Sequence, residues 1–315
     1  MDIRDTQELV KSHVMRGWLS ALRKYKALYV MMIPGLLYLA IYRYGAMYGL
    51  TIAFKNYRIA RGIRASEWIG LVNFDQLFSS PFWAMVLRNT IIISVYKLAF
   101  SFPAPILLAL MLNEVGHLKT KRVLQTVMYL PHFLSWVVMG HLVFMMLGPA
   151  TGMLSGAFRS ITGRELNMLI NPKTFRGLLV ITQIWKSAGW GTIIYLAALT
   201  NIDPRLYEAA RVDGSKKIQE IWYITIPSIV PVMIVVLFLN LGNMLHAGFQ
   251  QVLVMQNSYV YEVSEIIETY IYKVAFVQGR YAIASAAGLF QSTIGMILVV
   301  GANKLAKVLG KEGFW

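Results

Sequence analysis

The sequence has 315 residues, of which 57% are hydrophobic and only 14% are charged, and it carries a formal net charge of +15 and no cysteine. A soluble domain usually has about a quarter charged residues, so this composition indicates an integral membrane protein. The lack of cysteine excludes disulfides and cysteine-based metal sites. The Lys and Arg residues mostly flank apolar stretches, which argues against nucleic acid as a partner.

Six stretches are apolar enough, over roughly 20 residues each, to cross a membrane as helices. Their approximate limits are 28–53, 86–113, 123–147, 178–199, 224–245 and 284–306. Prolines interrupt several of them, which is tolerated where neighbouring helices or a wet cavity satisfy the freed carbonyls. The sequence therefore predicts an all-α integral membrane protein with about six transmembrane helices. Its organisation is an N-terminal arm over 1–27, a transmembrane domain over 28–306 and a tail over 307–315.

The basic residues outside these stretches are unevenly divided between the two sides of the membrane. Sixteen Lys and Arg residues lie in the two terminal segments and in the loops 115–122 and 200–223, against ten in the other three loops. Because cytoplasmic loops hold the excess of positive charge, we expect both termini to be cytoplasmic.

The loop before the fifth stretch has the pattern of two short helices joined by a turn. Asp203 and Pro204 are suited to start a helix, because Asp caps the first turn and Pro fits its backbone. Gly214 then allows a sharp turn. An amphipathic piece over 218–223 leads to Pro227. We expect an elbow that lies along the membrane surface and faces the cytoplasm.

The same loop carries a spaced motif: Glu-Ala-Ala at 208–210, then Gly214 after three residues, then Ile-x-Ile-Pro at 224–227 after nine more. This spacing resembles the EAA loop of permeases from binding-protein-dependent ABC importers, with Ile226 where Leu is usual. Other strings over most of the chain look like the LplB-type subfamily, including those at 34–38, 102–105, 190–199, 249–253 and 312–315.

The resemblance implies the type I ABC importer permease fold in a bacterial cytoplasmic (inner) membrane, with a core permease domain at about 85–303. It implies a heterodimer with a second permease, two ATPase subunits and an extracytoplasmic solute-binding protein. ATP and Mg²⁺ would be bound by the ATPase, with no cofactor in this chain. The elbow over 203–227 would be the ATPase-coupling loop, and the coupling residues that the resemblance implies are Glu208, Ala209, Ala210, Asp213, Gly214, Ile224 and Pro227.

The subfamily imports oligosaccharides, including anionic uronate oligomers such as alginate or pectin fragments. The ten outer basic residues leave two interpretations open. They attract an anionic sugar or an acidic face of the binding protein, or they form an ordinary solvated surface.

Polar residues inside apolar spans are costly and mark candidate pathway positions. The residues proposed for the substrate pathway are Lys186, Trp190, Asn240, Asn243 and His246. For Lys186 the alternative is a structural role beside a neighbouring helix, and for the two Asn residues it is hydrogen bonding between helices. Lys97 is ambiguous.

The chain is expected to be a transport subunit and not an enzyme. The sequence Gly-Ser-Lys at 214–216 lacks the upstream glycine and the Gly-Lys pair of a phosphate-binding loop, so a partner must hydrolyse ATP. Two alternatives are an ion-coupled secondary transporter and an intramembrane enzyme. The first normally needs acidic residues within the spans and the second a catalytic cluster at membrane depth, and the sequence offers neither.

Overall fold

A computed structural model describes residues 24–149 and 152–308. Most of the arm over 1–27 and of the tail over 307–315 therefore lies outside the described residues. The regular secondary structure of the described part is helical, and turns, loops and one isolated bridge between Lys55 and Trp68 connect the helices.

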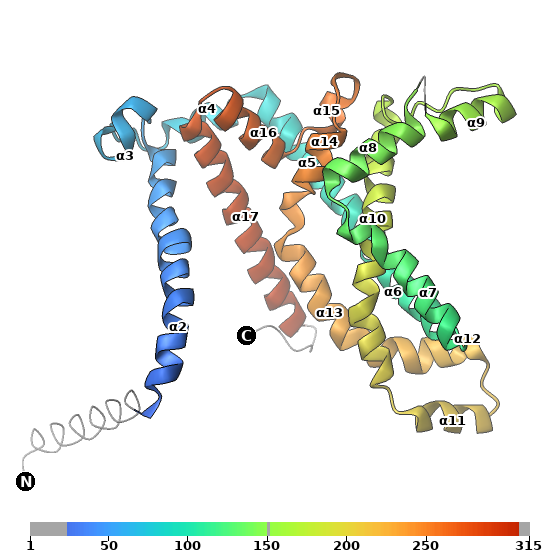
Figure 1. Cartoon of the computed structure of the whole chain (residues 1–315). Coiled ribbons are helices and arrows are strands. Elements are labelled where there is room, and N and C mark those ends of the chain that lie inside the picture. Colours follow the sequence, from blue (N-terminus) through green and yellow to red (C-terminus); the bar gives the residue numbers. More distant parts are fainter. Residues whose placement is uncertain (1–23, 150–151, 309–315) are drawn as a thin grey trace, which may run out of the picture.

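Long helices form the body of the molecule (Figure 1). In chain order they are α2 (Lys26–Tyr38) with η1 (Leu39–Gly45) and η2 (Tyr48–Phe54), α5 (Pro81–Ser101), α6 (Pro103–Asn113), α7 (Leu118–Tyr129) with η4 (Leu130–Phe133), α8 (Trp136–Leu147), α10 (Pro172–Thr200), α13 (Ile226–Gly242) and α17 (Tyr281–Val308).

Shorter helices connect them. These are η3 (Ile59–Arg61), α3 (Gly62–Ala65), α4 (Val72–Phe78), α9 (Met153–Thr162), α11 (Pro204–Val212), α12 (Lys217–Glu220), η5 (Ile221–Thr225), η6 (Met244–His246), α14 (Phe249–Met255), η7 (Ser258–Val260), α15 (Tyr261–Ser264), α16 (Ile267–Tyr272) and η8 (Lys273–Val277).

Four helical stretches of the described residues are long and apolar enough to cross a membrane: Lys26–Phe54, Pro81–Asn113, Lys217–Gly242 and Tyr281–Lys304. The pair Leu118–Phe133 and Trp136–Leu147, which is bent by 104°, adds a fifth if the two helices form one broken span. Together they coincide with five of the six predicted stretches. The bend follows from Pro131, which interrupts the helix, and from Ser135, whose side chain accepts the Val138 N–H and starts α8 afresh.

The remaining predicted stretch, 178–199, lies within α10. This helix has 29 residues, so it measures about 43 Å at 1.5 Å per residue, which exceeds the hydrocarbon core of a bilayer. It is less apolar than the other spans because its middle carries Thr182, Gln183 and Lys186. The length of α10 is sufficient for a sixth membrane-spanning helix, whereas its amino-acid composition alone would not indicate one.

α10 is the central helix of the bundle and packs against α5, α6, α7 and α13. Toward one end Phe175 and Leu179 pack with Val252 of α14, and toward the other Tyr195 packs with Ala109 and Ile229. The two ends of α10 therefore connect separate layers of the molecule.

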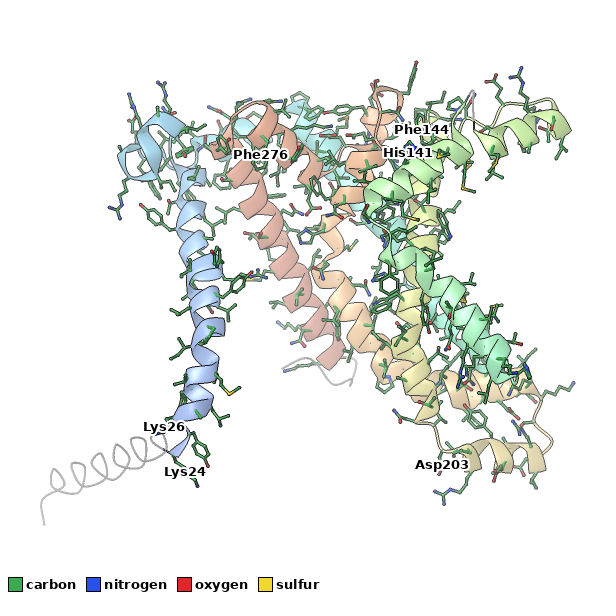
Figure 2. All side chains as sticks on the ribbon, in the orientation of Figure 1. Lys24, Lys26, His141, Phe144, Asp203 and Phe276 are labelled. Atoms are coloured by element: carbon green, nitrogen blue, oxygen red, sulfur yellow. The ribbon has the colours of Figure 1, made fainter. Side chains whose placement is uncertain are left out.

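The short connecting helices gather at two opposite ends of the bundle (Figure 1). The elbow α11–α12 lies at the same end as the start of α2, and α3, α4, α9 and α15 lie at the other. Figure 2 shows the same division in its labelled residues, with Lys24, Lys26 and Asp203 at one end and Phe144 and Phe276 at the other.

α2 and its continuation stand apart from the bundle (Figure 1). In the most apolar part of Lys26–Phe54, none of the residues is buried against the rest of the chain, although α2 is hydrophobic on every side. Its contacts with the bundle are made at its far end, where η2 meets α17 and α4. A helix that is apolar all round is normally enclosed by lipid or by another protein.

Candidate functional site

The elbow forms as the sequence predicted. The Asp203 carboxylate accepts the Arg205 N–H at 3.0 Å and caps α11, and Pro204 occupies the first turn. The guanidinium of Arg205 also donates to this carboxylate at 2.7 Å, which lowers the pKa of Asp203 and keeps the cap ionised. At Gly214 the φ angle is +78°, so the chain reverses where glycine is favoured. The helix–turn–helix geometry is confirmed.

An ion network that sequence reasoning did not identify braces the elbow. The side chain of Glu220 is only 3% exposed and accepts from Nε of Arg211 at 2.9 Å. Nζ of Lys217 lies 3.5 Å from Glu220 and 3.0 Å from Glu114, the residue that follows α6. The hydrogen bond to Glu220 raises the pKa of Arg211. The network therefore links α11, the start of the fifth span and the end of α6.

The outer surface of the elbow combines a carboxylate with uncovered apolar side chains. Glu208 and Ala209 are exposed, and Val212, Ile218 and Trp222 are 88%, 70% and 64% exposed. Ala210, Asp213, Gly214 and Ile224 line a depression between α11 and η5, whereas Pro227 lies outside it at the start of α13. A surface of this kind is typical of a protein–protein contact.

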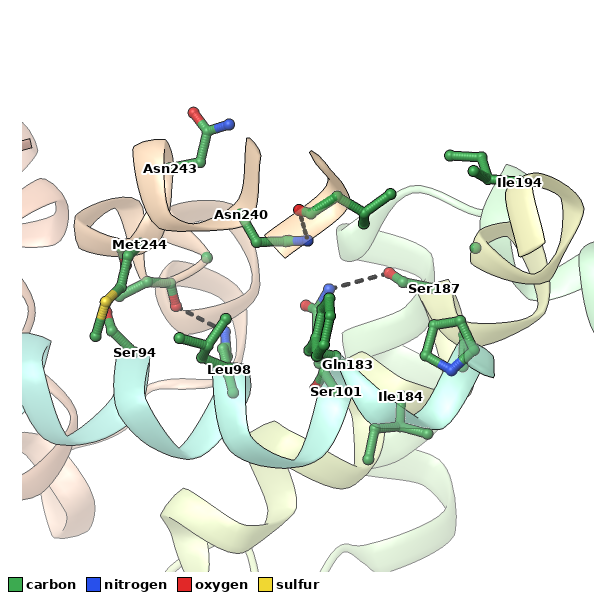
Figure 3. Close-up of a pocket in the computed structure, with 18 of the residues that line it drawn as sticks. Ser94, Leu98, Ser101, Gln183, Ile184, Ser187, Ile194, Asn240, Asn243 and Met244 are labelled. Carbon is green, nitrogen blue, oxygen red and sulfur yellow. Dashed lines mark hydrogen bonds between the residues drawn. The ribbon is translucent and has the colours of Figure 1, made fainter. Parts of the chain in front are cut away.

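A cavity of about 320 Å³, lined by both apolar and polar side chains, lies between α5, α6, α10 and α13 (Figure 3), and we call it the central cavity. Side chains from three of these helices point into it. Its polar lining consists of Ser94, Lys97 and Ser101 of α5, Gln183, Ser187 and Tyr195 of α10, and Asn240 and Asn243 at the end of α13.

Two hydroxyl groups in the lining are left without a partner. Oγ of Ser101 and Oη of Tyr195 are buried and accept or donate no hydrogen bond within the described residues. Asn240 and Asn243 donate their amide N–H groups to carbonyls one turn back, at 2.8 and 3.2 Å, which leaves their side-chain oxygens as acceptors. The two buried hydroxyls are closed off from the cavity, whereas the exposed side-chain oxygens of Asn240 and Asn243 can accept hydrogen bonds from a ligand rich in hydroxyl groups.

Of the five residues predicted for the pathway, Asn240 and Asn243 line the central cavity. Lys186 does not. Its Nζ points to the bend between α7 and α8 and donates to the carbonyls of Pro131, His132 and Leu134. Pro131 breaks the helix and frees these acceptors, so the ammonium group closes the gap. This position agrees with the alternative interpretation of Lys186 from the sequence, which is a structural role beside a neighbouring helix.

Trp190 and His246 also lie outside the central cavity. The Trp190 ring stacks on the ring of His132, with centroids 4.6 Å apart and planes 3° apart. Nδ1 of His246 lies 2.5 Å from the carboxylate of Glu268, and His246 lines a different recess beside α17. The three-residue spacing of Asn240, Asn243 and His246 predicted that they lie along one face of a helix. The α-helix ends at Gly242 and the chain turns at Ala247, so His246 does not continue that face.

Comparison with known proteins identifies the arrangement. Residues 101–307 match the family described as the binding-protein-dependent transport system inner membrane component. The chain belongs to this family. It is thus a multi-pass ABC transporter permease, and the family description places it in the inner membrane.

The permease resembles two proteins of Bacillus subtilis (strain 168) over nearly its whole length. It is 41% identical to the polygalacturonan/rhamnogalacturonan transport system permease protein YteP, with 98% of this chain and 96% of YteP aligned. It is 42% identical to the protein LplB, over 95% of this chain and 94% of LplB.

Solved structures share the fold of the permease. A bacterial alginate ABC transporter, in complex with a periplasmic protein that carries an alginate pentasaccharide, contains a chain that superposes with a TM-score of 0.86 at 37% identity. The match covers 93% of the permease and 98% of that chain. A second structure, of an ABC transporter for the acidic polysaccharide alginate, gives a TM-score of 0.87 at 38% identity, covering 94% and 100%. The type I permease fold is therefore shown.

Sequence reasoning missed most of the cavity lining. Ser94, Ser101, Gln183 and Ser187 are small or neutral polar residues within apolar helices, so each by itself resembles a residue that bonds to its own helix. The one signal that could have revealed them is a shared helical face: Gln183, Ser187 and Gly191 on α10, and Ser94, Lys97 and Ser101 on α5, recur every three or four residues.

Proposed function

We propose that the permease forms one half of the translocation pathway of an ABC importer for oligosaccharides, and that polysaccharide fragments bearing uronate groups are its substrates. The named relatives support the substrate class, since they are described as transport proteins for polygalacturonan and rhamnogalacturonan or for alginate. The central cavity, with the side-chain oxygens of Asn240 and Asn243 in its lining, supports a hydroxyl-rich ligand.

The braced elbow is the observation that carries the coupling mechanism. A partner ATPase would grip α11 through Glu208, Ala209 and the neighbouring apolar side chains. Because Glu220 joins Arg211 to Lys217, and Lys217 joins Glu114, movement of α11 would be passed to α6 and α13. Both of these helices border the central cavity. Closure of the ATPase dimer would then switch the cavity between the two sides by rigid-body motion.

The remaining partners and the orientation follow from the same proposal. ATP and Mg²⁺ would be bound by two ATPase subunits, and a solute-binding protein would deliver sugar at the end opposite the elbow. The elbow and both termini would face the cytoplasm, in line with the excess of Lys and Arg on that side. The uncovered α2 would lie against the second permease or the surrounding lipid. Family membership sets aside the ion-coupled transporter and the intramembrane enzyme.

Charge reversal at Glu208 tests the coupling. Glu208→Lys is expected to reduce the amount of ATPase that co-purifies with the complex by at least tenfold. The reason is that a positive charge would replace the carboxylate that contacts the ATPase. The membrane part of the permease should stay folded. Glu67→Lys, at an exposed position on the other end of the molecule, is the matched control and should retain the ATPase. Full retention by Glu208→Lys, or equal loss in both variants, would contradict the proposed contact.

A further inference from the structure

The central cavity has a single charged group in its described lining, the ammonium of Lys97 on α5. All other lining residues are apolar, glycine, hydroxyl or amide side chains. A charge at this depth in a membrane protein is costly and normally has either a counter-charge or a function.

Lys97 is held rigidly at the break between α13 and α14. Its Nζ donates to the carbonyl of Ala247 at 2.6 Å and to Oε1 of Gln251 at 2.5 Å. Gln251 is fully buried, and its amide nitrogen donates to the carbonyl of Leu179 and the hydroxyl of Thr182, both at 2.7 Å. Gly248 leaves the space that Lys97 needs, because a Cβ there would lie 2.3 Å from Nζ.

These partners satisfy only part of the ammonium group. An ammonium has three N–H donors, and the described residues supply acceptors for two of them, both neutral. No carboxylate of the described residues forms a salt bridge with Lys97. The Glu268 carboxylate interacts with the Lys97 ammonium through space, but its direct partner is His246. Among the described residues, the Lys97 ammonium therefore has no carboxylate in direct contact.

We propose that Lys97 is a specificity-determining residue of the central cavity, where its ammonium binds the carboxylate of a uronate unit during passage. The side-chain oxygens of Asn240 and Asn243 would accept hydrogen bonds from the hydroxyls of the same sugar. The arrangement favours anionic over neutral oligosaccharides, because an anion in the cavity would add the direct counter-charge that Lys97 lacks among the described residues. This inference rests on the proposed function and adds the residue that recognises the negative charge of the substrate.

The competing role is purely structural, in which Lys97 only ties α5 to the break before α14. Uptake by the reconstituted complex of both permeases, ATPase and binding protein separates the two roles. The probes are trigalacturonate and its fully methyl-esterified, uncharged counterpart. Because the same binding protein delivers both probes in every experiment, a change in their ratio between variants arises in the permease.

Lys97→Met is expected to lower trigalacturonate uptake at least tenfold relative to the wild type, and uptake of the ester by less than threefold. Lys97→Arg keeps the charge and should preserve the preference for the anion. Equal loss of both probes in Lys97→Met, or no loss of either, would overturn the proposal. If the wild type imports neither probe and other oligosaccharides also fail, the proposed function itself is wrong, which is a distinguishable outcome.

A second variant guards against misfolding of Lys97→Met. Gln183→Glu adds a carboxylate to the same cavity but removes none of the hydrogen bonds of Lys97, since Gln183 donates only to Ser187, at 3.0 Å. The new carboxylate would add a negative charge to the cavity lining, partly offset the charge of Lys97 and repel an anionic substrate. Trigalacturonate uptake is expected to fall at least fivefold more than uptake of the ester, and an unchanged ratio would count against the proposal.

Discussion

At the scale of single residues, the permease places two lysines of its helices in different surroundings. Lys186 donates to three carbonyls at the bend between α7 and α8, whereas Lys97 faces the central cavity with part of its ammonium free. Both residues are lysines within otherwise apolar stretches, so their neighbours in sequence do not distinguish them. The difference is which helix break each side chain reaches.

Replacement of Lys186 tests its structural role. Lys186→Met leaves carbonyls at the bend without a donor, so we expect the free energy of unfolding to fall by about 1–3 kcal/mol. The melting temperature of the purified complex should drop by several degrees, while uptake per folded transporter stays near the wild-type value. Lys173→Met, at an exposed position near the start of the same helix, should leave the melting temperature unchanged. An unchanged melting temperature with lost uptake would instead return Lys186 to the pathway.

At the scale of elements, the elbow is stiffened by one buried carboxylate. Glu220 stands between two cations, and Tyr207 of α11 shares a hydrogen bond of 3.0 Å with Thr225 of η5. α11 is thereby fixed to the chain that enters the membrane. In the proposed coupling, a loop with the same motif but without these bonds would bend when the ATPase moves α11 and would pass little of that movement to the transmembrane helices.

Loss of this carboxylate should uncouple the transporter without releasing its ATPase. Glu220→Gln removes the charge that holds Arg211 and Lys217, so we expect transport per ATP hydrolysed to fall severalfold while the ATPase still co-purifies. Glu208→Gln is the matched control on the exposed face, where the ATPase contact should weaken and the elbow should remain braced. The ratio of sugar imported to phosphate released, measured in proteoliposomes, distinguishes the two. The bracing role is refuted if Glu220→Gln keeps the wild-type ratio.

At the scale of the whole molecule, the permease leaves one of its spanning stretches unpacked. The most apolar window of Lys26–Phe54 buries none of its residues against the rest of the chain, and this stretch stands on one flank of the bundle (Figure 1). A single long helix that protrudes in this way is suited to reach a neighbouring subunit.

Cross-linking tests where this helix lies. The chain has no cysteine, so Met31→Cys, at a position that is 77% exposed, gives a unique site for a benzophenone label. We expect illumination of the assembled transporter to yield a covalent product with the second permease. Val137→Cys, 66% exposed on α8 at the opposite flank, should yield little of this product. A product with lipid alone at Met31 would show that the helix faces the bilayer and not the subunit.

Much of the elbow was determined by local sequence. Asp203, Pro204 and Gly214 act on neighbouring residues through a cap, a fixed φ angle and a positive φ angle, so their effects do not depend on distant parts of the chain. The apolar stretches likewise predicted the four helices that are long and apolar enough to cross a membrane, and the bent pair Leu118–Phe133 and Trp136–Leu147. The residues of the elbow that contact the ATPase remain predictions that the coupling experiments address.

The cavity lining, the ion network and the role of Lys186 were decided by tertiary structure. Glu114 and Lys217 are far apart in sequence and meet only because the start of α12 lies beside the end of α6. Gly189 is required because a Cβ there would lie 2.0 Å from the carbonyl oxygen of Met128, a contact between α10 and α7 that periodicity does not reveal. Sequence by itself determined the membrane class, the helical stretches and the elbow, since hydrophobicity and capping act over short distances. Only the packed bundle decided which polar side chains face the cavity, because that depends on the rotation and the breaks of several helices at once.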